Sequence, residues 1–398
     1  MRKRRWIAGI AAAALLAGAC TDDSDDTEAS DETSGEEAAA DIEGGQESEF
    51  FSQEEMDAQL AMRDATPEGP EDKPWEQAIE PEYVDTAEFA QPGGGWNVCF
   101  SNAATDNPWR QVGFTTMQAE VELHPEIADF TVLDAEASDD KQISDIESLT
   151  GQGCDALIVS PNTTATLTPA VEAACETGIP VIVFDRGVNT DCPVTFIKPI
   201  GGYAFGADAA EFLVDEVEPG GKVLALRILP GVDVLETRFA GAQQIFEEND
   251  IELVGAEFTE GDAAATKSIV ADYIAREGGL DGIWMDAGAT AVAAIEAFED
   301  AGEEVPPITG EDQQDFLQKW DEDGLTAIAP TYPTYQWRTP VIAAVRILSG
   351  EQVPAEWNLP QPKITEENLQ DYLQPDMGPL HYALCGCEDM PGFPERWQ

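Results

Sequence analysis

Residues 178–187 of this chain read GIPVIVFDRG, and this stretch is the clearest single indication of the fold. A segment with helical spacing over 168–177 ends at Gly178, the first residue of this stretch, and the continuous apolar run 181–184 follows shortly after. Such a short apolar run is typical of a strand buried on both faces of a parallel sheet. The run stops at Asp185 and Arg186, two charged residues placed where the predicted strand ends.

The same alternation of strands and helices extends outward from this stretch. Before it, strand-like runs and helical segments lie at 96–100, 111–123, 130–133, 141–152 and 156–159. After it, the pattern repeats at 205–217, 223–229, 237–248, 252–257, 263–276, 282–285, 291–301, 307–310, 326–329 and 339–348. Short apolar strands between helices of about 10–15 residues predict parallel sheets with helices on both faces. Two successive arrays predict an α/β fold of two doubly wound parallel-sheet lobes.

The N-terminus has the order of a secretory signal peptide, expected to span 1–19. Residues 1–5 are mostly basic, and 7–16 form an apolar run too short to span a bilayer comfortably. Small residues directly before Cys20 resemble a bacterial lipobox, which predicts that Cys20 is lipidated. Ordinary cleavage, with Cys20 as a bystander, is the alternative. No later segment has 18 consecutive apolar residues, so the lipid is the only membrane attachment expected.

The chain is strongly acidic, with 79 acidic and 20 basic residues and a net charge of −59. This charge argues against nucleic acid and anionic lipid surfaces as partners, and a saline habitat would account for it. Residues 21–72 are dominated by Asp, Glu, Ser, Thr and Gly. Such a composition cannot offset the entropy of ordering, so residues 20–92 are predicted to form an acidic, disordered tether.

The cysteine count favours disulfides. Beyond Cys20 there are six cysteines, namely Cys99, Cys154, Cys175, Cys192, Cys385 and Cys387. An even number in an exported protein favours disulfides, and six cysteines allow 15 pairings. Cys175 and Cys192 flank the predicted strand 181–184, so we expect these two to be bonded to each other.

A zinc site is the alternative use of the last two cysteines. His381, Cys385 and Cys387 would supply its ligands. The chain lacks the paired C-x-x-C spacing typical of structural zinc sites, so the sequence predicts no metal and no other cofactor.

Polar and aromatic residues follow the strands of the first array. After 96–100, Asn107 is suited to cap the next helix, which leaves Trp109 and Arg110 on its first turn. Ser160 follows the next buried strand, and the pair 185–186 follows 181–184. An indole can cover the C–H face of a sugar, and an adjacent carboxylate and guanidinium suit vicinal hydroxyls. A helix cap and a structural ion pair are the simpler interpretations.

The second array repeats this placement. Arg238, Asp286, Asp312 and Tyr332 lie at or near predicted strand ends or at the start of a helix. Each alone has a simple interpretation as a cap or a surface residue. In open α/β sheets, however, ligands bind outside the carboxyl ends of the strands. Acidic, basic and aromatic groups at those ends in both arrays predict one shared polar crevice.

From about residue 96 to 348, the order of these motifs resembles the ribose-binding-protein-like, type I periplasmic binding proteins. The motifs that carry the resemblance are Asn107-Pro108-Trp109, Ile158-Val159-Ser160-Pro161, the stretch 178–186, Gly221-Lys222-Val223, Arg238-Phe239-Ala240-Gly241 and Ile308-Thr309-Gly310-Glu311-Asp312. The resemblance implies two lobes joined by three crossing segments that close on a monosaccharide or polyol. The expected crossings lie near 198–199, 330 and 354. Lobe 1 is then 93–198 plus 330–354, and lobe 2 is 199–329 plus 355–398.

The resemblance also implies which residues contact the ligand. These are Asn107, Trp109, Asp185, Arg186, Arg238 and Asp312, with Asp286 one residue away from the expected asparagine. Ser160 and Tyr332 complete the predicted set. Arg110 departs from the family pattern, which has a second aromatic residue there. An added cation suits an acidic sugar, or it pairs with a carboxylate of the protein.

The function predicted from these features is extracytoplasmic solute binding, with delivery of a sugar, polyol or sugar acid to the permease of an ABC importer. The protein is expected to be a monomer anchored to the cell membrane, with no nucleic-acid partner. A sensory protein of the same fold is the alternative. A carbohydrate-acting enzyme is disfavoured because the chain has only His124 and His381 as histidines and no G-x-S-x-G motif.

Overall fold

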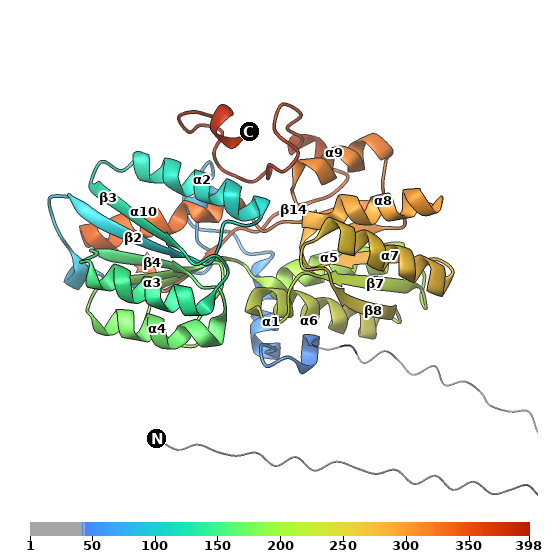
Figure 1. The fold of residues 1–398 in the computed structure, drawn as a ribbon, viewed down its shortest axis with the longest axis horizontal. Coiled ribbons are helices and arrows are strands. Elements are labelled where there is room, and N and C mark those ends of the chain that lie inside the picture. The colour runs from blue at the N-terminus through green and yellow to red at the C-terminus, as the bar shows by residue number, and fades with distance from the viewer. Residues whose placement is uncertain (1–41, 43) are drawn as a thin grey trace, which may run out of the picture. The chain divides into compact units, whose positions relative to one another are not determined.

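The computed structural model describes Ile42 and residues 44–398. The predicted signal peptide and Cys20 lie outside the described residues. Within the described part of the chain, every helix is too short or too polar to cross a membrane. The described residues contain two six-stranded sheets, each the centre of one α/β lobe (Figure 1).

The sheet of lobe 1 has the strand order β13-β6-β5-β4-β2-β3, and all its pairs are parallel. Its strands are β2 (Trp96–Asn102), β3 (Ile127–Asp134), β4 (Ala156–Ser160), β5 (Val181–Phe184), β6 (Thr195–Pro199) and β13 (Glu356–Leu359). The chain moves outward from β2 to β3 and then returns to β4 on the other side. The topology therefore switches between β2 and β4, where their carboxyl ends leave room for a ligand.

Both faces of this sheet are covered by helices, as the continuous apolar strands predict. Phe100 and Ile158 pack with α2 (Pro108–Glu122) and α10 (Thr339–Ser349) on one face. Leu157 and Val159 pack with α3 (Asp139–Gly151) and α4 (Thr164–Glu176) on the other. Successive strand residues point to opposite faces, so the central strands β2, β4 and β5 each contribute to two hydrophobic clusters. Figure 1 shows the two helix layers on either side of β2 and β4.

Lobe 2 repeats this arrangement with the strand order β14-β11-β10-β9-β7-β8. Its strands are β7 (Lys222–Arg227), β8 (Glu252–Phe258), β9 (Gly282–Met285), β10 (Ile308–Thr309), β11 (Ala327–Pro330) and the antiparallel edge strand β14 (Lys363–Ile364). Its helices are α5 (Gly202–Glu216), α6 (Asp233–Glu248), α7 (Ala263–Glu277), α8 (Ala291–Ala301) and α9 (Gln314–Asp323). The predicted fold class, two doubly wound parallel-sheet lobes, is confirmed.

The crossings between the lobes follow the prediction at two of three places. The chain passes from β6 to α5 next to Pro199, and from β11 to lobe 1 after Pro330. The third crossing was expected near 354, and this expectation is wrong. Residues 353–354 form β12, which pairs with β1 (Tyr83–Val84), and β13 then adds to the lobe 1 sheet beside β6. The crossing comes only between β13 and β14, at residues 360–362.

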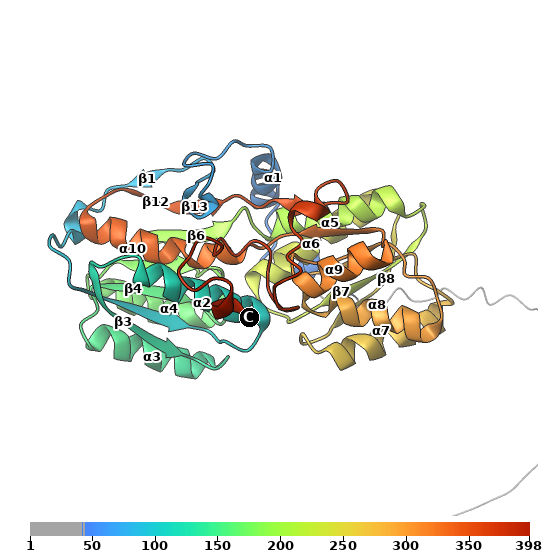
Figure 2. The same cartoon turned by 90° about the horizontal axis from the view of Figure 1, so that it is seen from above.

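The prediction of a disordered tether over 20–92 does not hold from Gly44 onward. Helix α1 (Gln53–Met62) packs on lobe 2, where Met56 contacts Tyr203 of α5. Farther along, the Ile79 amide donates to the Asn358 carbonyl in lobe 1 at 2.8 Å. A few apolar residues within an acidic segment are enough to dock it on a folded body, which composition alone does not reveal. Figure 2 shows α1 and β1 along the same side as β12 and β13.

The C-terminal segment, assigned to lobe 2 from the sequence, contacts both lobes. In lobe 2 the Leu384 amide donates to the Asp312 carboxylate at 2.8 Å. In lobe 1 the Tyr335 amide donates to the Leu384 carbonyl at 3.0 Å. Residues of this segment also form a hydrophobic cluster with Val112 and Ala119 of α2. The segment 377–398, hereafter the tail, therefore links the two lobes (Figure 2).

All six cysteines beyond Cys20 are in disulfides. Cys175 is bonded to Cys192, the pair predicted from their positions around β5. Cys99 on β2 is bonded to Cys154, and Cys385 in the tail is bonded to Cys387. In lobe 1, the Cys175–Cys192 disulfide joins α4 to the loop between β5 and β6, and the Cys99–Cys154 disulfide joins β2 to the loop before β4.

Candidate functional site

A cavity of about 380 Å³ lies between the two lobes. Its walls are built from residues that follow the carboxyl ends of strands in both sheets, together with Tyr382 of the tail. Most of the predicted site residues line it, namely Asn107, Trp109, Arg110, Asp185, Arg186, Arg238 and Tyr332. Its volume lies within the ~300–1,000 Å³ typical of small-molecule sites.

The start of α2 supplies an aromatic wall of the cavity. The Asn107 side chain caps the helix by accepting from the Arg110 amide at 3.0 Å, and Pro108 occupies the first helical position. This local geometry places Trp109 on the first turn. Its indole N–H donates to the Tyr332 carbonyl at 2.7 Å, and the Trp109 and Tyr332 ring centroids are 5.6 Å apart. The ring is therefore held in one orientation beside the cavity.

Arg110 pairs with a carboxylate of the protein, which was one of its two predicted roles. Its Nη2 atom lies 2.8 Å from Oδ2 of Asp185, and its Nη1 atom donates to Ser160 Oγ at 3.2 Å. Arg110 is 2% exposed, and burial lowers its pKa to about 10 despite the Asp185 carboxylate. The arginine remains charged at pH 7, and its charge is neutralised by Asp185. The Ser160 hydroxyl donates to Asp185 Oδ2 at 3.3 Å, and Ser160 does not line the cavity.

The neighbour expected to pair with Asp185 has a different partner. Arg186 donates to the Asn162 carbonyl at 2.5 Å, and among the described residues it forms no ion pair. The two adjacent residues therefore have different partners, and Asp185 adopts a positive φ of 71°. The Arg186 guanidinium lines the cavity with donors left over for a ligand.

From lobe 2, Arg238 of α6 reaches the cavity. It donates to the Asp286 carbonyl and to the Glu311 carboxylate, the latter at 3.2 Å. Its guanidinium carbon lies 4.6 Å from the Tyr332 ring centroid, within the range of a cation–π contact. Arg238 is 2% exposed, and within the described chain its Nε atom has no hydrogen-bond partner.

Asp286 and Asp312 do not line the cavity, contrary to the expectation from the resemblance. Both carboxylate oxygens of Asp286 accept from the Ile228 amide at 3.0 Å, which directs the side chain toward β7. The Asp312 carboxylate accepts from Leu384 of the tail, which covers it. Burial raises the pKa of each aspartate to about 7. At Asp312 the tail occupies one carboxylate oxygen, and the residue is fully buried.

Sequence reasoning missed several residues that line the cavity, among them Asp106, Glu260, Glu311 and Tyr382. Glu311 neutralises Arg238, and Tyr382 projects from the tail. Glu311 immediately precedes the predicted Asp312, so its position after β10 was a usable signal. Tyr382 lies in a segment with no strand or helix pattern, and only the tertiary structure brings it here.

A direct contact joins the lobes beside the cavity. The Gly187 amide in lobe 1 donates to the Asp233 carboxylate in lobe 2 at 2.8 Å. Burial raises the pKa of Asp233. Asp185 and Tyr332 border both this cavity and a second one of about 810 Å³, which α1 also lines. The described conformation is therefore one in which the lobes touch across the site.

The fold and the interlobe cavity define a class of two-lobed binding proteins. A family model described as a periplasmic binding protein domain matches residues 98–352, so the chain belongs to this family.

Curated relatives and solved structures agree with this assignment. The chain is 24% identical over 277 residues to the ribose import binding protein of Bacillus subtilis (strain 168), covering 68% of this chain and 89% of that protein. An ABC transporter solute binding protein from Thermobispora bispora superposes with a TM-score of 0.66 at 22% identity, covering 72% of this chain and 90% of that one. A solute binding protein from Bacillus halodurans with bound myo-inositol gives 0.65 at 22% identity, covering 70% and 97%. These relatives are binding proteins by name and not enzymes, which is the class that the sequence predicts.

Proposed function

We propose that this chain binds a neutral monosaccharide or polyol in the interlobe cavity and delivers it to the permease of an ABC importer. The observation that carries the proposal is the cavity itself, which both lobes line at the carboxyl ends of their sheets. A ligand that contacts both lobes favours their closure, which is how such a protein presents a loaded state to a partner.

The charge around the cavity favours a neutral ligand over a sugar acid. Four carboxylates line it, from Asp106, Asp185, Glu260 and Glu311, against three guanidinium groups, from Arg110, Arg186 and Arg238. Two of the three cations are already paired, Arg110 with Asp185 and Arg238 with Glu311. An added carboxylate would find only Arg186 without such a partner. Hydroxyl groups, which both donate and accept, match this mixed lining better.

The aromatic lining supports a ring or chain with exposed C–H groups. Trp109 and Tyr332 lie beside each other on the lobe 1 side, and Tyr382 lies on the tail side. Aromatic rings supply large contact area at small entropic cost. The ribose and myo-inositol named for two relatives are of this chemical class.

The proposal includes a site and two lobes with bounds revised from the sequence prediction. Asn107, Trp109, Arg186, Arg238 and Tyr332 would contact the ligand directly, and Asp185 would act with Arg110. Lobe 1 would comprise 93–199 with 331–359, and lobe 2 would comprise 200–330 with 363–376. Lipidation at Cys20 would anchor the protein to the cell membrane, and Cys20→Ala should then release it from the membrane fraction.

A thermal-shift screen of pentoses, hexoses, alditols, inositols and sugar acids tests the ligand class, because a ligand that binds only the folded state raises its stability. Isothermal titration of the best compound should give one site per chain. Arg186→Gln should weaken this binding by at least tenfold, whereas Arg276→Gln, a change of the same chemistry on the exposed face of α7, should leave it unchanged. If only sugar acids or other charged solutes bind, the neutral-ligand proposal is wrong.

A further inference from the structure

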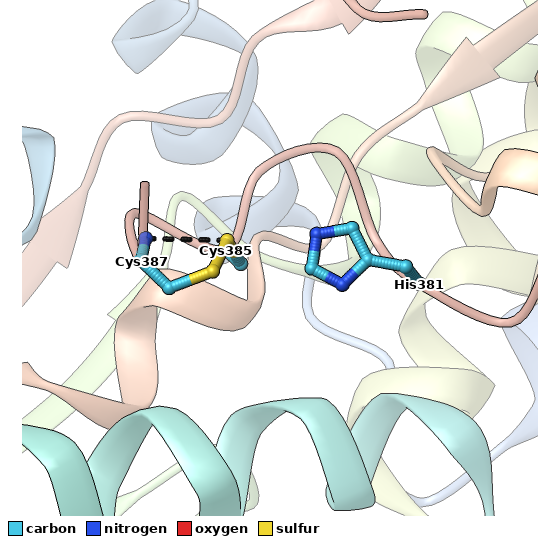
Figure 3. Close-up of side chains that lie close together, drawn as sticks. All are labelled: His381, Cys385 and Cys387. Atoms are coloured by element: carbon cyan, nitrogen blue, oxygen red, sulfur yellow. Dashed lines mark hydrogen bonds between the residues drawn. A yellow bond between two sulfur atoms is a disulfide. The ribbon is translucent and has the colours of Figure 1, made fainter. Parts of the chain in front are cut away.

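The tail contains a cluster of three potential metal ligands that the solute site does not use. The ligand atoms of His381, Cys385 and Cys387 all lie within 4.8 Å of one another, and all three residues are buried. In Figure 3 the imidazole ring of His381 faces the two sulfur atoms. The described structure has the cysteines joined as a disulfide.

His381 is buried without any compensation for its polar atoms. Its side chain is 2% exposed, and in the described part of the chain neither Nδ1 nor Nε2 has a hydrogen-bond partner. Burying a polar group without a partner is costly, and such groups in native proteins call for an explanation such as a bound ion. A metal ion bound to one ring nitrogen would supply the missing interaction.

The backbone around the three side chains is held in place from several directions. The Gln314 amide donates to the His381 carbonyl at 2.8 Å, and Arg338 donates to the Gly386 carbonyl at 2.5 Å. Gly386 has a φ of 58°, and a Cβ atom there would lie 2.6 Å from the Trp75 ring, so only glycine fits between the cysteines. The backbone that carries the three side chains is therefore held in place independently of any ion.

One contact is suited to a thiolate in particular. The Cys387 amide donates to Cys385 Sγ at 3.2 Å, drawn as the dashed line in Figure 3. An N–H group that donates to sulfur stabilises the charged form of that sulfur, which is the form that binds metals. Outer contacts of this kind commonly orient metal ligands.

The disulfide itself contributes little as a structural link. Cys385 and Cys387 are separated by 2 positions, whereas Cys99 and Cys154 are separated by 55. Because a cross-link stabilises mainly by restricting the unfolded chain, a bond across so short a loop restricts very little. The two buried sulfurs therefore need another reason to be placed beside the histidine.

We propose that, after reduction of the disulfide, His381, Cys385 and Cys387 bind one thiophilic d¹⁰ metal ion, Cu⁺ or Zn²⁺, as its three protein ligands. A dithiol supplies two electrons and two protons, becomes a disulfide itself, and leaves two thiols in the tail. The metal ion then displaces the two thiol protons. One imidazole and two thiolates suit both ions. Met377 and Met390 pack in the same hydrophobic cluster as the cysteines, and such soft surroundings favour Cu⁺.

Metal binding by the reduced full chain tests the proposal. Cys20→Ala removes the one cysteine outside the three disulfides, and a phosphine reductant under anaerobic conditions opens the tail disulfide, as mass mapping of alkylated peptides verifies. Competition with a Cu⁺ chelator and equilibrium dialysis with Zn²⁺ should each report on one site per chain, and the ion bound more tightly identifies the preferred metal. The disulfide form should bind neither ion at this site.

Variants then assign the ligands. Cys387→Ser should abolish binding, and His381→Gln should weaken it at least tenfold. Cys175→Ser is the matched control, since it also leaves a single cysteine of a reducible pair, and it should bind as the parent chain does. X-ray absorption of the loaded parent chain needs no variant and should show two sulfur and one nitrogen neighbours. Absence of binding by chains with both tail thiols verified, equal affinity in His381→Gln, or a metal shell without sulfur would each overturn the proposal.

Discussion

The Arg110–Asp185 pair allows a quantitative prediction. Both side chains are almost fully buried, at 3% and 5% exposure, and their charged atoms are 2.8 Å apart. Asp185→Ala removes the carboxylate and leaves the Arg110 guanidinium charged at pH 7 in a site closed to water. We expect the free energy of unfolding to fall by about 3–5 kcal/mol, the usual cost of breaking one partner out of a buried pair.

The geometry supports a value of this size. Two unit charges about 4 Å apart interact by roughly 4 kcal/mol at an effective dielectric constant near 20. The alanine variant also loses the acceptor that Ser160 uses at 3.3 Å. Asp185→Asn keeps an acceptor oxygen and a residue type that tolerates a positive φ, so it should be less destabilising than alanine. Replacing both residues, as in Arg110→Met with Asp185→Asn, removes the unpaired charge and should recover part of the loss.

Urea unfolding at pH 7 of the parent chain, Arg110→Met, Asp185→Asn and the variant with both changes gives a double-mutant cycle for the pair. We expect a coupling free energy of more than about 1 kcal/mol between Arg110 and Asp185, well beyond the ~0.3–0.5 kcal/mol within which independent sites add. Titration of the folded Asp185 variants with the identified solute should also show at least tenfold weaker binding, because the pair forms part of the cavity wall. Additive effects of the two substitutions, or a loss below 1 kcal/mol in Asp185→Ala, would refute the reasoning.

Three further predictions concern the acid beneath the tail, the aromatic wall and the contact between the lobes. Because burial raises the pKa of Asp312 to about 7, the folded state binds its proton more tightly than the unfolded state, and the free energy of unfolding should decrease as the pH rises from about 4 to about 7. Urea unfolding at pH 5 and pH 8 measures this decrease, and in Asp312→Asn the decrease should be smaller by on the order of 2 kcal/mol. The same decrease in the parent chain and in the variant would contradict the raised pKa of Asp312. Trp109→Ala should weaken solute binding at least tenfold and reduce the fluorescence change on binding, so a full fluorescence response in the variant would place the ligand elsewhere. Asp233→Ala removes the acceptor of the Gly187 amide and should increase the radius of gyration of the solute-free protein in small-angle scattering. Saturating solute should decrease this radius. Equal radii for the solute-free parent chain and the variant would show that this contact does not hold the lobes together.

Local features of the sequence determined the two lobes because each signal acts over a few neighbouring residues. The apolar run of β5 predicts a strand buried on both faces wherever it lies, and its end at Asp185 follows from the change to charged residues. Asn107 and Pro108 specify the start of α2 through a side-chain cap and a fixed φ. The missed strand β6 has an alternating burial pattern in place of a continuous apolar run, so the same criterion does not detect it.

Only the tertiary structure decided which charges meet and what covers the site. Arg186 is the sequence neighbour of Asp185, but Arg110, 75 positions away, is its partner, because α2 begins and β5 ends at the same edge of the lobe 1 sheet. The tail has no periodic pattern, yet it covers Asp312, supplies Tyr382 to the cavity and brings His381 to two cysteines. Its position depends on long-range hydrogen bonds and on packing against α2, and neither leaves a local signal in the sequence. Residues 44–92 likewise lack a local signal for their position, because their few apolar side chains are buried only by packing against the folded lobes.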